Sequence, residues 1–265
     1  LNAQVEPVQF QWDSIASYPL QKGVNGAFIG IHNENLIVAG GANFPETPAW
    51  EGGKKTWYSD INVLQKNGNS FEWVEGISES LPMPLAYGAS VSTPGGVLVI
   101  GGNNANGIYS HVYLLKWDPR ASDLEIIEQP PLPVPLANMQ ATRIGNEVFV
   151  VGGQLEEGSP ATNRFFSFKN GTWRELPPLP GPGRIQPVVI SQNNGRADVV
   201  YVFSGTHYDP EAADPDPAAP RTTIRVRLDE VGQPVVLEPG AALDRLAAWK
   251  GRIDRLATDT AAMSD

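Results

Sequence analysis

Short apolar runs recur along the chain, and each is followed by small or polar residues at a strand end. Three stretches share one form, in which four apolar residues precede a glycine doublet and a polar loop: NLIVAGGANF (35–44), GVLVIGGNNA (96–105) and EVFVVGGQLE (147–156). A fourth copy, DVVYVFSGTH (198–207), has Ser204 in place of the first glycine. These positions are 40, 101, 152 and 204, so the spacings are 61, 51 and 52. Apolar runs of this length bounded by turn residues predict buried β-strands.

The flanks of these runs repeat as well. Upstream of the last three copies stand LPMPLAYGASVS (81–92), LPVPLANMQATRI (132–144) and LPPLPGPGRIQPVVI (176–190). Downstream stand YSDINVL (58–64), YSHVYLL (109–115) and NRFFSFK (163–169), followed by FEWVEGI (71–77), LEIIEQP (124–130) and TWRELPP (172–178). Each unit therefore predicts four short strands, with the glycine pair closing the second strand.

The doublets raise the alternative of a phosphate-binding loop. A dinucleotide-binding loop has the form G-x-G-x-x-G and runs directly into a helix. Here neither that spacing nor a helical pattern follows the doublet. We expect these glycines to let the backbone turn sharply and pack closely at a strand end.

Composition agrees with an all-β chain of many short strands. The sequence has 265 residues with 27 Gly and 24 Pro, and 41% of the residues are hydrophobic. The net charge of −10 and the lack of a basic cluster beyond Lys54–Lys55 argue against a nucleic-acid partner, because such binding depends on neutralising phosphates. No apolar run is long enough to predict a membrane span. With no Cys, disulfides, thiol catalysis and Cys-ligated zinc are excluded.

A period near 50 with a Gly doublet and a Trp about 20 residues later resembles kelch repeats, which form the blades of a β-propeller. The stretches GVNGAFIGIHNENLIVAGGANF (23–44), GKKTWYSDINVL (53–64) and AYGASVSTPGGVLVIGG (86–102) are more specifically similar to the N-acetylneuraminate epimerase (sialic acid mutarotase) family, in its cyclically permuted branch. The resemblance covers roughly residues 10–205. It implies an all-β, kelch-type propeller with four recognisable four-stranded blades, whereas the parent family has six.

The predicted organisation places the propeller blades in residues 1–228, with residues 10–20 as an outer strand that closes a blade. A six-bladed ring at this period needs about 300 residues, and the pattern fades after residue 228. The atypical segment 229–265 predicts a strand within 232–240 and a helix over 241–262, with apolar residues at helical spacing. A natural four- or five-bladed closure, a truncation and a replaced tail all remain open.

In such blades, the loops from strand two to strand three share a rim with the segments that enter each first strand. We expect these parts to converge near the central channel of the propeller. They are the loops 42–57, 103–108 and 154–162 and the three Pro-rich segments within 81–92, 132–144 and 176–190, which enter the first strands and are called the entrance segments. Polar residues expected there also include Lys54, Asn103, Asn138 and Gln154. The candidates for binding an acidic sugar are Arg184, Gln186, Lys55, Asn43, Tyr87 and Gln140. Because the substrate implied by the resemblance carries a carboxylate, Arg184 and Lys55 are the candidate anion ligands.

Several of these residues have ordinary structural alternatives. Arg184 would otherwise be a solvated turn residue, and Lys55 one of a solvated lysine pair. Asn43 follows a glycine doublet, where Asn often occupies a left-handed turn. Tyr87 would otherwise be a buried residue at the start of an inner strand. The histidines His32, His111 and His207 are scattered without ligand spacing, so no metal or cofactor is expected.

Mutarotation requires removal of a proton from the anomeric hydroxyl and delivery of one to the ring oxygen, which is general acid–base work. The resemblance places the acid–base pair on a stretch of the form G-E-x-K-P-G-x-R, and no such stretch occurs in this sequence. Glu230 or Glu238 with Arg225 is the nearest combination, but it does not match that form. The catalytic residues are therefore unassigned.

The sequence thus favours an isomerase that interconverts anomers of sialic acid or a related acidic sugar. The alternative is a non-enzymatic kelch module that binds a glycan or a protein on its loop rim, and the missing acid–base stretch favours it. A chain that starts LNAQ rather than with Met is consistent with signal-peptide removal or with a fragment of a longer chain. The first interpretation is favoured, so a periplasmic or secreted location is expected. The sequence does not determine an oligomeric state.

Overall fold

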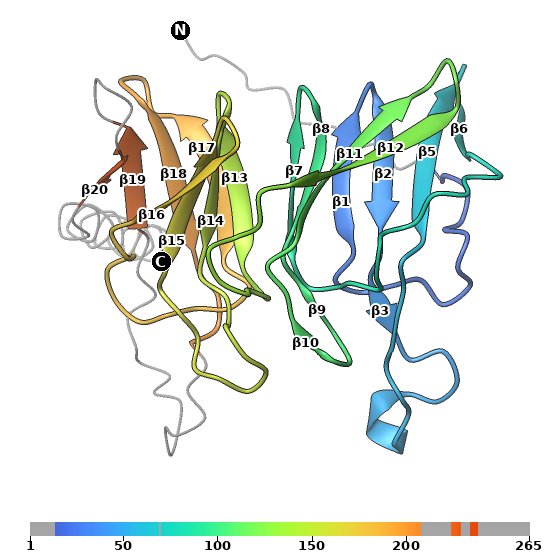
Figure 1. Ribbon diagram of the computed structural model, residues 1–265, viewed down its shortest axis with the longest axis horizontal. Coiled ribbons are helices and arrows are strands. Elements are labelled where there is room, and N and C mark those ends of the chain that lie inside the picture. Colours follow the sequence, from blue (N-terminus) through green and yellow to red (C-terminus); the bar gives the residue numbers. More distant parts are fainter. Residues whose placement is uncertain (1–13, 69, 208–223, 229–233, 238–265) are drawn as a thin grey trace, which may run out of the picture.

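The computed structural model describes residues 14–68, 70–207, 224–228 and 234–237, and these form four antiparallel four-stranded sheets (Figure 1). Blade 1 contains β1 (Phe28–His32), β2 (Asn35–Ala39), β5 (Ile61–Asn67) and β6 (Ser70–Trp73); blade 2 contains β7 (Ala89–Thr93), β8 (Gly96–Ile100), β11 (Val112–Asp118) and β12 (Asp123–Gln129). Blade 3 contains β13 (Gln140–Ile144), β14 (Glu147–Val151), β15 (Phe165–Lys169) and β16 (Thr172–Leu176); blade 4 contains β17 (Val188–Asn193), β18 (Asp198–Phe203), β19 (Ile224–Leu228) and β20 (Pro234–Leu237). The predicted four-bladed, all-β architecture is confirmed.

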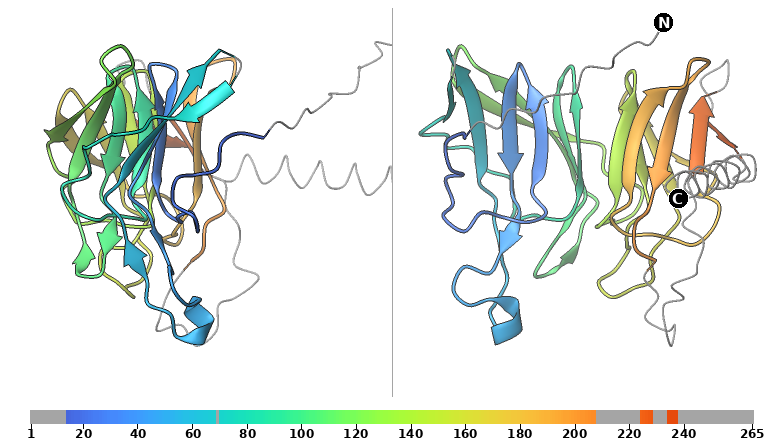
Figure 2. Two further views of the ribbon diagram at one scale, coloured as in Figure 1. Left: turned by 90° about the vertical axis from the view of Figure 1, so that its right-hand side faces the viewer. Right: turned by 180° about the vertical axis from the view of Figure 1, so that it is seen from behind.

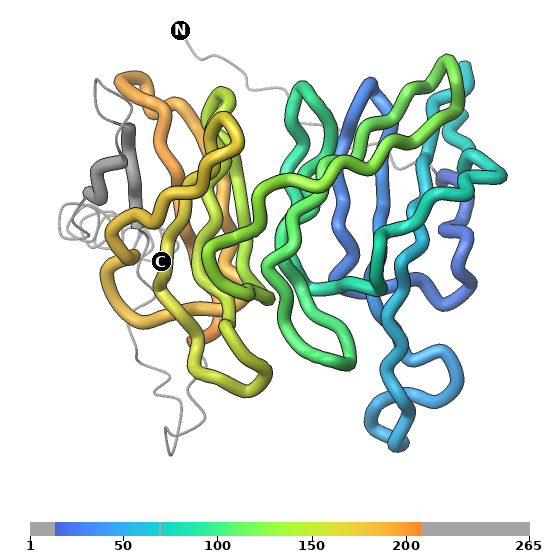
Figure 3. The backbone as a smooth tube through the Cα atoms, in the orientation of Figure 1, coloured from blue at the N-terminus to red at the C-terminus, as the bar shows by residue number. Residues whose placement is uncertain are grey.

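The strand order within each blade follows the chain, and the first strand of each blade lies innermost. The inner strands are neighbours in the order β1, β7, β13 and β17. Blades 1 and 2 occupy the right half of Figure 3, and blades 3 and 4 the left half. β20 is the strand predicted within residues 232–240, and it pairs with β19 to complete blade 4. The helix predicted over 241–262 lies outside the described residues.

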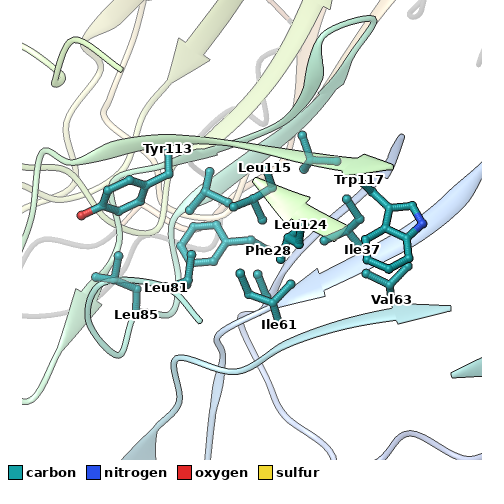
Figure 4. Packing of buried hydrophobic residues seen from close by; sticks show 13 residues of the cluster. Phe28, Ile37, Ile61, Val63, Leu81, Leu85, Tyr113, Leu115, Trp117 and Leu124 are labelled. Atoms are coloured by element: carbon teal, nitrogen blue, oxygen red, sulfur yellow. The ribbon is translucent and has the colours of Figure 1, made fainter. Parts of the chain in front are cut away.

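The core consists of apolar layers between successive blades. Along β1 the side chains alternate, with Phe28 and His32 buried toward blade 2 and Ile29 exposed. Phe28 packs in a cluster that also contains Leu115 and Trp117 of blade 2 (Figure 4). Further clusters fill the spaces between blades 2 and 3 and between blades 3 and 4. Burying each large apolar side chain stabilises the fold by about 1.5–3 kcal/mol, so the blades depend on their neighbours.

The glycine doublets lie where adjacent blades meet. The second glycine of each doublet donates its N–H to a carbonyl of the next blade, from Gly41 to Leu85, from Gly102 to Leu136 and from Gly153 to Arg184, each at 2.8 Å. A Cβ on the first glycine, Gly40, Gly101 or Gly152, would overlap with that same carbonyl oxygen. These glycines also have positive φ angles of 61°, 57° and 73°. The doublets are therefore inter-blade packing positions, as the sequence predicted, and not phosphate loops.

Ser204 replaces the first glycine in blade 4. It keeps a left-handed backbone, with φ of 53°, but it is exposed, whereas Gly40, Gly101 and Gly152 are buried. A side chain is tolerated there because no following blade covers Ser204 among the described residues.

One end of the blades carries additional structure. Two short ribbons, β3 (Ala42–Asn43) with β4 (Thr56–Trp57) and β9 (Asn103–Asn104) with β10 (Gly107–Ile108), project beyond the four-stranded sheets at this end. The 3-10 helix η1 (Ala49–Glu51) lies at the tip of the longer loop (Figures 1 and 2). This end, called the rim below, includes the starts of all four inner strands, as the sequence analysis predicted.

The segment 10–20 was predicted to be an outer closing strand. Only residues 14–20 of it are described, and they contain no strand. They lie against the outer strand of blade 1, where the Trp73 indole N–H donates to the Ala16 carbonyl and Tyr18 packs edge-on against Trp73 at 5.3 Å between ring centroids.

Candidate functional site

The rim is organised by one left-handed residue at the entrance to each inner strand. Tyr87, Asn138 and Gln186 have φ angles of 59°, 58° and 49°, and Gly26 has 65° at the equivalent position of blade 1. Such values are uncommon for residues with side chains and mark positions held by their surroundings.

Backbone hydrogen bonds join these four positions into a continuous row across the blades. The amide of Tyr87 donates to the Gly26 carbonyl at 2.8 Å, that of Asn138 to Tyr87 at 2.6 Å, and that of Gln186 to Asn138 at 2.7 Å. The side chains of Tyr87, Asn138 and Gln186 therefore lie on consecutive blades around the inner edge of the rim. Two of the predicted ligands, Tyr87 and Gln186, belong to this row. Gln140, a third, is exposed at the start of β13.

Lys55 lies against three aromatic rings at this edge. Its ammonium nitrogen is 4.9 Å from the Tyr87 ring centroid, 5.5 Å from that of Trp57 and 5.7 Å from that of Phe44. These distances are within the range of attractive cation–π contacts. The contacts restrain a long side chain that remains exposed to solvent, so they present a positive charge beside aromatic faces. We call Lys55, Phe44, Trp57 and Tyr87 the rim cluster.

The rim cluster depends on the β3–β4 ribbon. Pairing of Asn43 with Thr56 places the next residues outward, Phe44 and Lys55, opposite each other. The Trp57 indole N–H also donates to Asn103 Oδ1 of blade 2 at 3.3 Å, which links the loops of two blades. Phe44 and Trp57 were missed by the sequence analysis, because the long insertion concealed the register of this ribbon. Lys54, next to Lys55, is exposed and has no such aromatic contacts among the described residues.

Asn43 has a structural role. Its amide nitrogen donates to the Gly23 carbonyl at 2.7 Å, and its Oδ1 accepts from the Tyr58 hydroxyl at 2.8 Å. In blade 2, Asn104 makes the same two bonds, to the Pro84 carbonyl at 3.0 Å and from the Tyr109 hydroxyl at 3.1 Å. Asn43 lies in β3 and does not have the left-handed backbone considered from the sequence. Because the same arrangement recurs in two blades, it belongs to the repeat.

Gln154 also has a structural role, because both ends of its side-chain amide form hydrogen bonds within the rim. It is buried, its Oε1 accepts from the Asn138 amide at 3.0 Å, and its Nε2 donates to the Ser159 carbonyl at 2.7 Å. Asn138 and Gln154 therefore stabilise the rim of blade 3.

Arg184 is buried, with 5% of its surface exposed, at the seam between blades 3 and 4. It occupies the entrance position at which blades 2 and 3 carry the fully buried Leu85 and Leu136. One guanidinium nitrogen donates to the Ser204 carbonyl at 3.1 Å, and burial lowers the pKa of the guanidinium from its ordinary value. The solvated alternative considered from the sequence does not apply to this residue.

The histidines are separate from one another and from the rim cluster. His32 Nδ1 accepts from the Trp117 amide at 3.0 Å, His111 lies between Tyr109 and Tyr113, and His207 Nδ1 contacts the Gly183 carbonyl at 3.1 Å. No group of three or more His, Cys, Asp or Glu side chains suited to a metal occurs within the described ranges. The helices of the described part include none long and apolar enough to cross a membrane.

Glu230 and Glu238, considered with Arg225 as an acid–base combination, lie outside the described residues. On the described part of the rim, no contact brings a carboxylate to the ammonium group of Lys55. The geometry therefore offers a cation with aromatic surfaces and neighbouring amides, which suits binding of a polar anion.

Comparison with known proteins shows what part of this chain is similar to. Residues 2–126 match the family model described as N-acetylneuraminate epimerase. The N-acetylneuraminate epimerase of Brucella suis is 35% identical over 130 residues, which are 43% of this chain and 32% of that protein. The one from Vibrio cholerae serotype O1 is 40% identical over 143 residues, 48% of this chain and 36% of that protein. The resemblance indicated by the sequence motifs is confirmed over residues 2–126. The chain matches about a third of the length of these two relatives.

The structure of YjhT is similar to a larger part of this chain. It has a TM-score of 0.54 and 14% identity, and the likeness covers 86% of this chain and 87% of that one. At this identity the likeness supports the propeller fold alone.

Proposed function

We propose that this chain carries the substrate-binding rim of a sugar isomerase that interconverts anomers of N-acetylneuraminate or a closely related acidic sugar. The observation that carries the proposal is that the matched region, residues 2–126, contains all four residues of the rim cluster. The two relatives described above, matched over 130 and 143 residues, are N-acetylneuraminate epimerases.

The chemistry of the rim cluster fits such a sugar. The ammonium group of Lys55 can pair with a carboxylate, and the faces of Trp57 and Tyr87 can contact the apolar face of a sugar ring. Gln186 and Gln140 can donate to and accept from hydroxyl or acetamido groups. A sugar bound to the rim cluster would have its polar edge toward the row formed by Tyr87, Asn138 and Gln186.

The acid–base groups of the reaction are not identified among the described residues. Opening of the sugar ring needs a base at the anomeric hydroxyl and an acid at the ring oxygen. The absence from the sequence of the family's G-E-x-K-P-G-x-R stretch favours a second candidate function, a non-enzymatic module that binds an acidic glycan with the same rim cluster. A role in carbohydrate metabolism and a periplasmic or secreted location remain part of the proposal.

Proton NMR distinguishes these functions. Freshly dissolved α-N-acetylneuraminate is followed as it approaches the β anomer, with wild-type protein, Lys55→Gln and Lys54→Gln. We expect Lys55→Gln to lower the catalysed rate at low substrate by about 10- to 100-fold, which corresponds to loss of one charge-assisted contact of about 1.5–3 kcal/mol. Lys54→Gln is the matched control, since it removes an equal charge from the adjacent exposed position and should change the rate less than twofold.

Each result has a defined meaning. Acceleration by wild type that is lost in Lys55→Gln alone supports the isomerase and its site. Equal loss in both variants would show that general charge, and not the rim cluster, attracts the substrate. No acceleration with sugar binding retained would replace the enzyme with the glycan-binding module.

A further inference from the structure

Arg143 lies on the inner strand β13, at the end away from the rim, and its guanidinium group is held in a fixed orientation. Its Nε donates to the Ser92 carbonyl of blade 2 at 2.8 Å, and one terminal nitrogen donates to the Gly145 carbonyl at 2.8 Å. A guanidinium carries five N–H groups, so these bonds leave three for a further partner.

Two cavities meet at this guanidinium. One, of about 460 Å³, lies along the inner strands of blades 2, 3 and 4, and its lining residues include Arg143, Ser90, Ser92, Thr142 and Ser191. The other, of about 300 Å³, lies between the strand-joining turns of blades 2 and 3. Among the described residues no carboxylate lines either cavity. Arg143 also forms no ion pair with a described residue.

The chain has a net charge of −10, yet the Arg143 guanidinium is oriented by two carbonyl groups rather than by a carboxylate. The repeat does not demand it, because the equivalent positions of blades 1, 2 and 4 carry Ile31, Ser92 and Ser191. By contrast, the half-buried Arg164 is paired with the Glu175 carboxylate at 2.7 Å. A planar fork whose orientation is already fixed loses little freedom on binding a carboxylate.

The surrounding groups indicate the class of ligand. Thr142 and Ser191 make no side-chain hydrogen bond with any other described residue, so their hydroxyl groups are available to a ligand. Ser90 is committed, because its hydroxyl accepts from the Ile29 amide and donates to the Ile29 carbonyl. A bidentate cation beside two available hydroxyls suits an anion that itself carries hydroxyl groups.

We propose that Arg143 anchors a second binding site, separate from the rim cluster, for a small hydroxylated carboxylate. The carboxylate pairs with the free edge of the guanidinium, and the hydroxyl groups of the ligand bond to Thr142 and Ser191. This site does not depend on the proposed isomerase activity.

Isothermal titration with gluconate tests the site, because gluconate has a carboxylate and hydroxyl groups but no anomeric centre. Sorbitol serves as the uncharged comparator. We expect wild type to bind gluconate and not sorbitol, and Arg143→Gln to weaken gluconate binding at least tenfold. Arg196→Gln is the matched control, since it removes the same charge from an exposed turn that lines neither cavity.

Arg143→Gln also removes a contact between blades 2 and 3, so its folding is checked by urea denaturation. Ser191→Ala gives an independent test, because this exposed side chain supports no other group, and we expect it to weaken gluconate binding two- to fivefold. Undiminished binding by Arg143→Gln, or no gluconate binding by wild type, would overturn the proposal. Loss in Lys55→Gln with no effect in Arg143→Gln would also overturn it, and would assign carboxylate binding to the rim cluster.

Discussion

Substitution of Gly101 by Ala tests how the blades are joined. Gly101 has φ of 57°, and a Cβ there would overlap with the Leu136 carbonyl oxygen, to which Gly102 donates. A left-handed alanine costs about 1–2 kcal/mol, and forcing an atom into a packed seam costs about 1–3 kcal/mol more. We therefore expect Gly101→Ala to reduce the free energy of unfolding by about 2–5 kcal/mol.

Gly145→Ala is the matched control. Gly145 has nearly the same backbone, with φ of 56°, but nothing lies within 4 Å of an added Cβ. The free energy of unfolding of Gly145→Ala should therefore fall only by the cost of a left-handed alanine, about 1–2 kcal/mol. Urea denaturation of both variants and wild type measures the difference, provided the m-values agree. Equal losses in the two variants would refute the inference that the doublets exist to bring neighbouring blades into contact.

Three further predictions concern the rim and the blades. Tyr58→Phe and Tyr109→Phe should each lower the free energy of unfolding by about 1 kcal/mol, because each hydroxyl donates to a repeat asparagine; a large effect in only one, measured in urea, would contradict their equivalence. Arg184→Leu should change stability by less than about 1 kcal/mol in thermal denaturation, since it restores the residue type of Leu85 and Leu136, and a loss above about 3 kcal/mol would show that the guanidinium stabilises the seam. The Arg164 guanidinium lowers the pKa of the Glu175 carboxyl, so the pair stabilises the fold above the ordinary pKa of a glutamate and loses that effect as the pH falls through the lowered value. Glu175→Gln should therefore cost up to about 1 kcal/mol at pH 7, limited by solvent screening of this partly exposed pair, and progressively less in acid; a cost independent of pH would exclude the ion pair as its cause.

The repeated pattern was sufficient to predict the blades. Four apolar residues before each doublet specify a buried second strand, and the similar flanks specify the strands beside it. The same repetition identified the rim, because the entrance segments of successive blades must lie at one end. Tyr87 and Gln186, two of the residues it singled out, belong to the hydrogen-bonded row at the entrances of the inner strands.

The side-chain environments were less predictable. Aligning PGPGRIQP with LPMPLAYG and LPVPLANM would have shown that Arg184 takes the place of Leu85 and Leu136, and therefore that it lies in a seam. No such internal copy exists for the insertion before Trp57, so the contact of Lys55 with Phe44 could not be inferred from the repeat. Arg143 resembled any polar residue of a strand until the structure showed its fixed guanidinium and the cavities around it.

We expect an acidic sugar to bind at the rim and to be converted there between its anomers. One proton NMR experiment measures both binding and conversion, by recording in the same sample the decay of the α anomer of N-acetylneuraminate and the transfer of saturation from protein methyl groups to the sugar. If the sugar binds and is converted at the rim, we expect saturation transfer together with a decay rate that increases in proportion to protein concentration. The absence of both saturation transfer and acceleration at high protein concentration would contradict binding and conversion of the sugar at the rim.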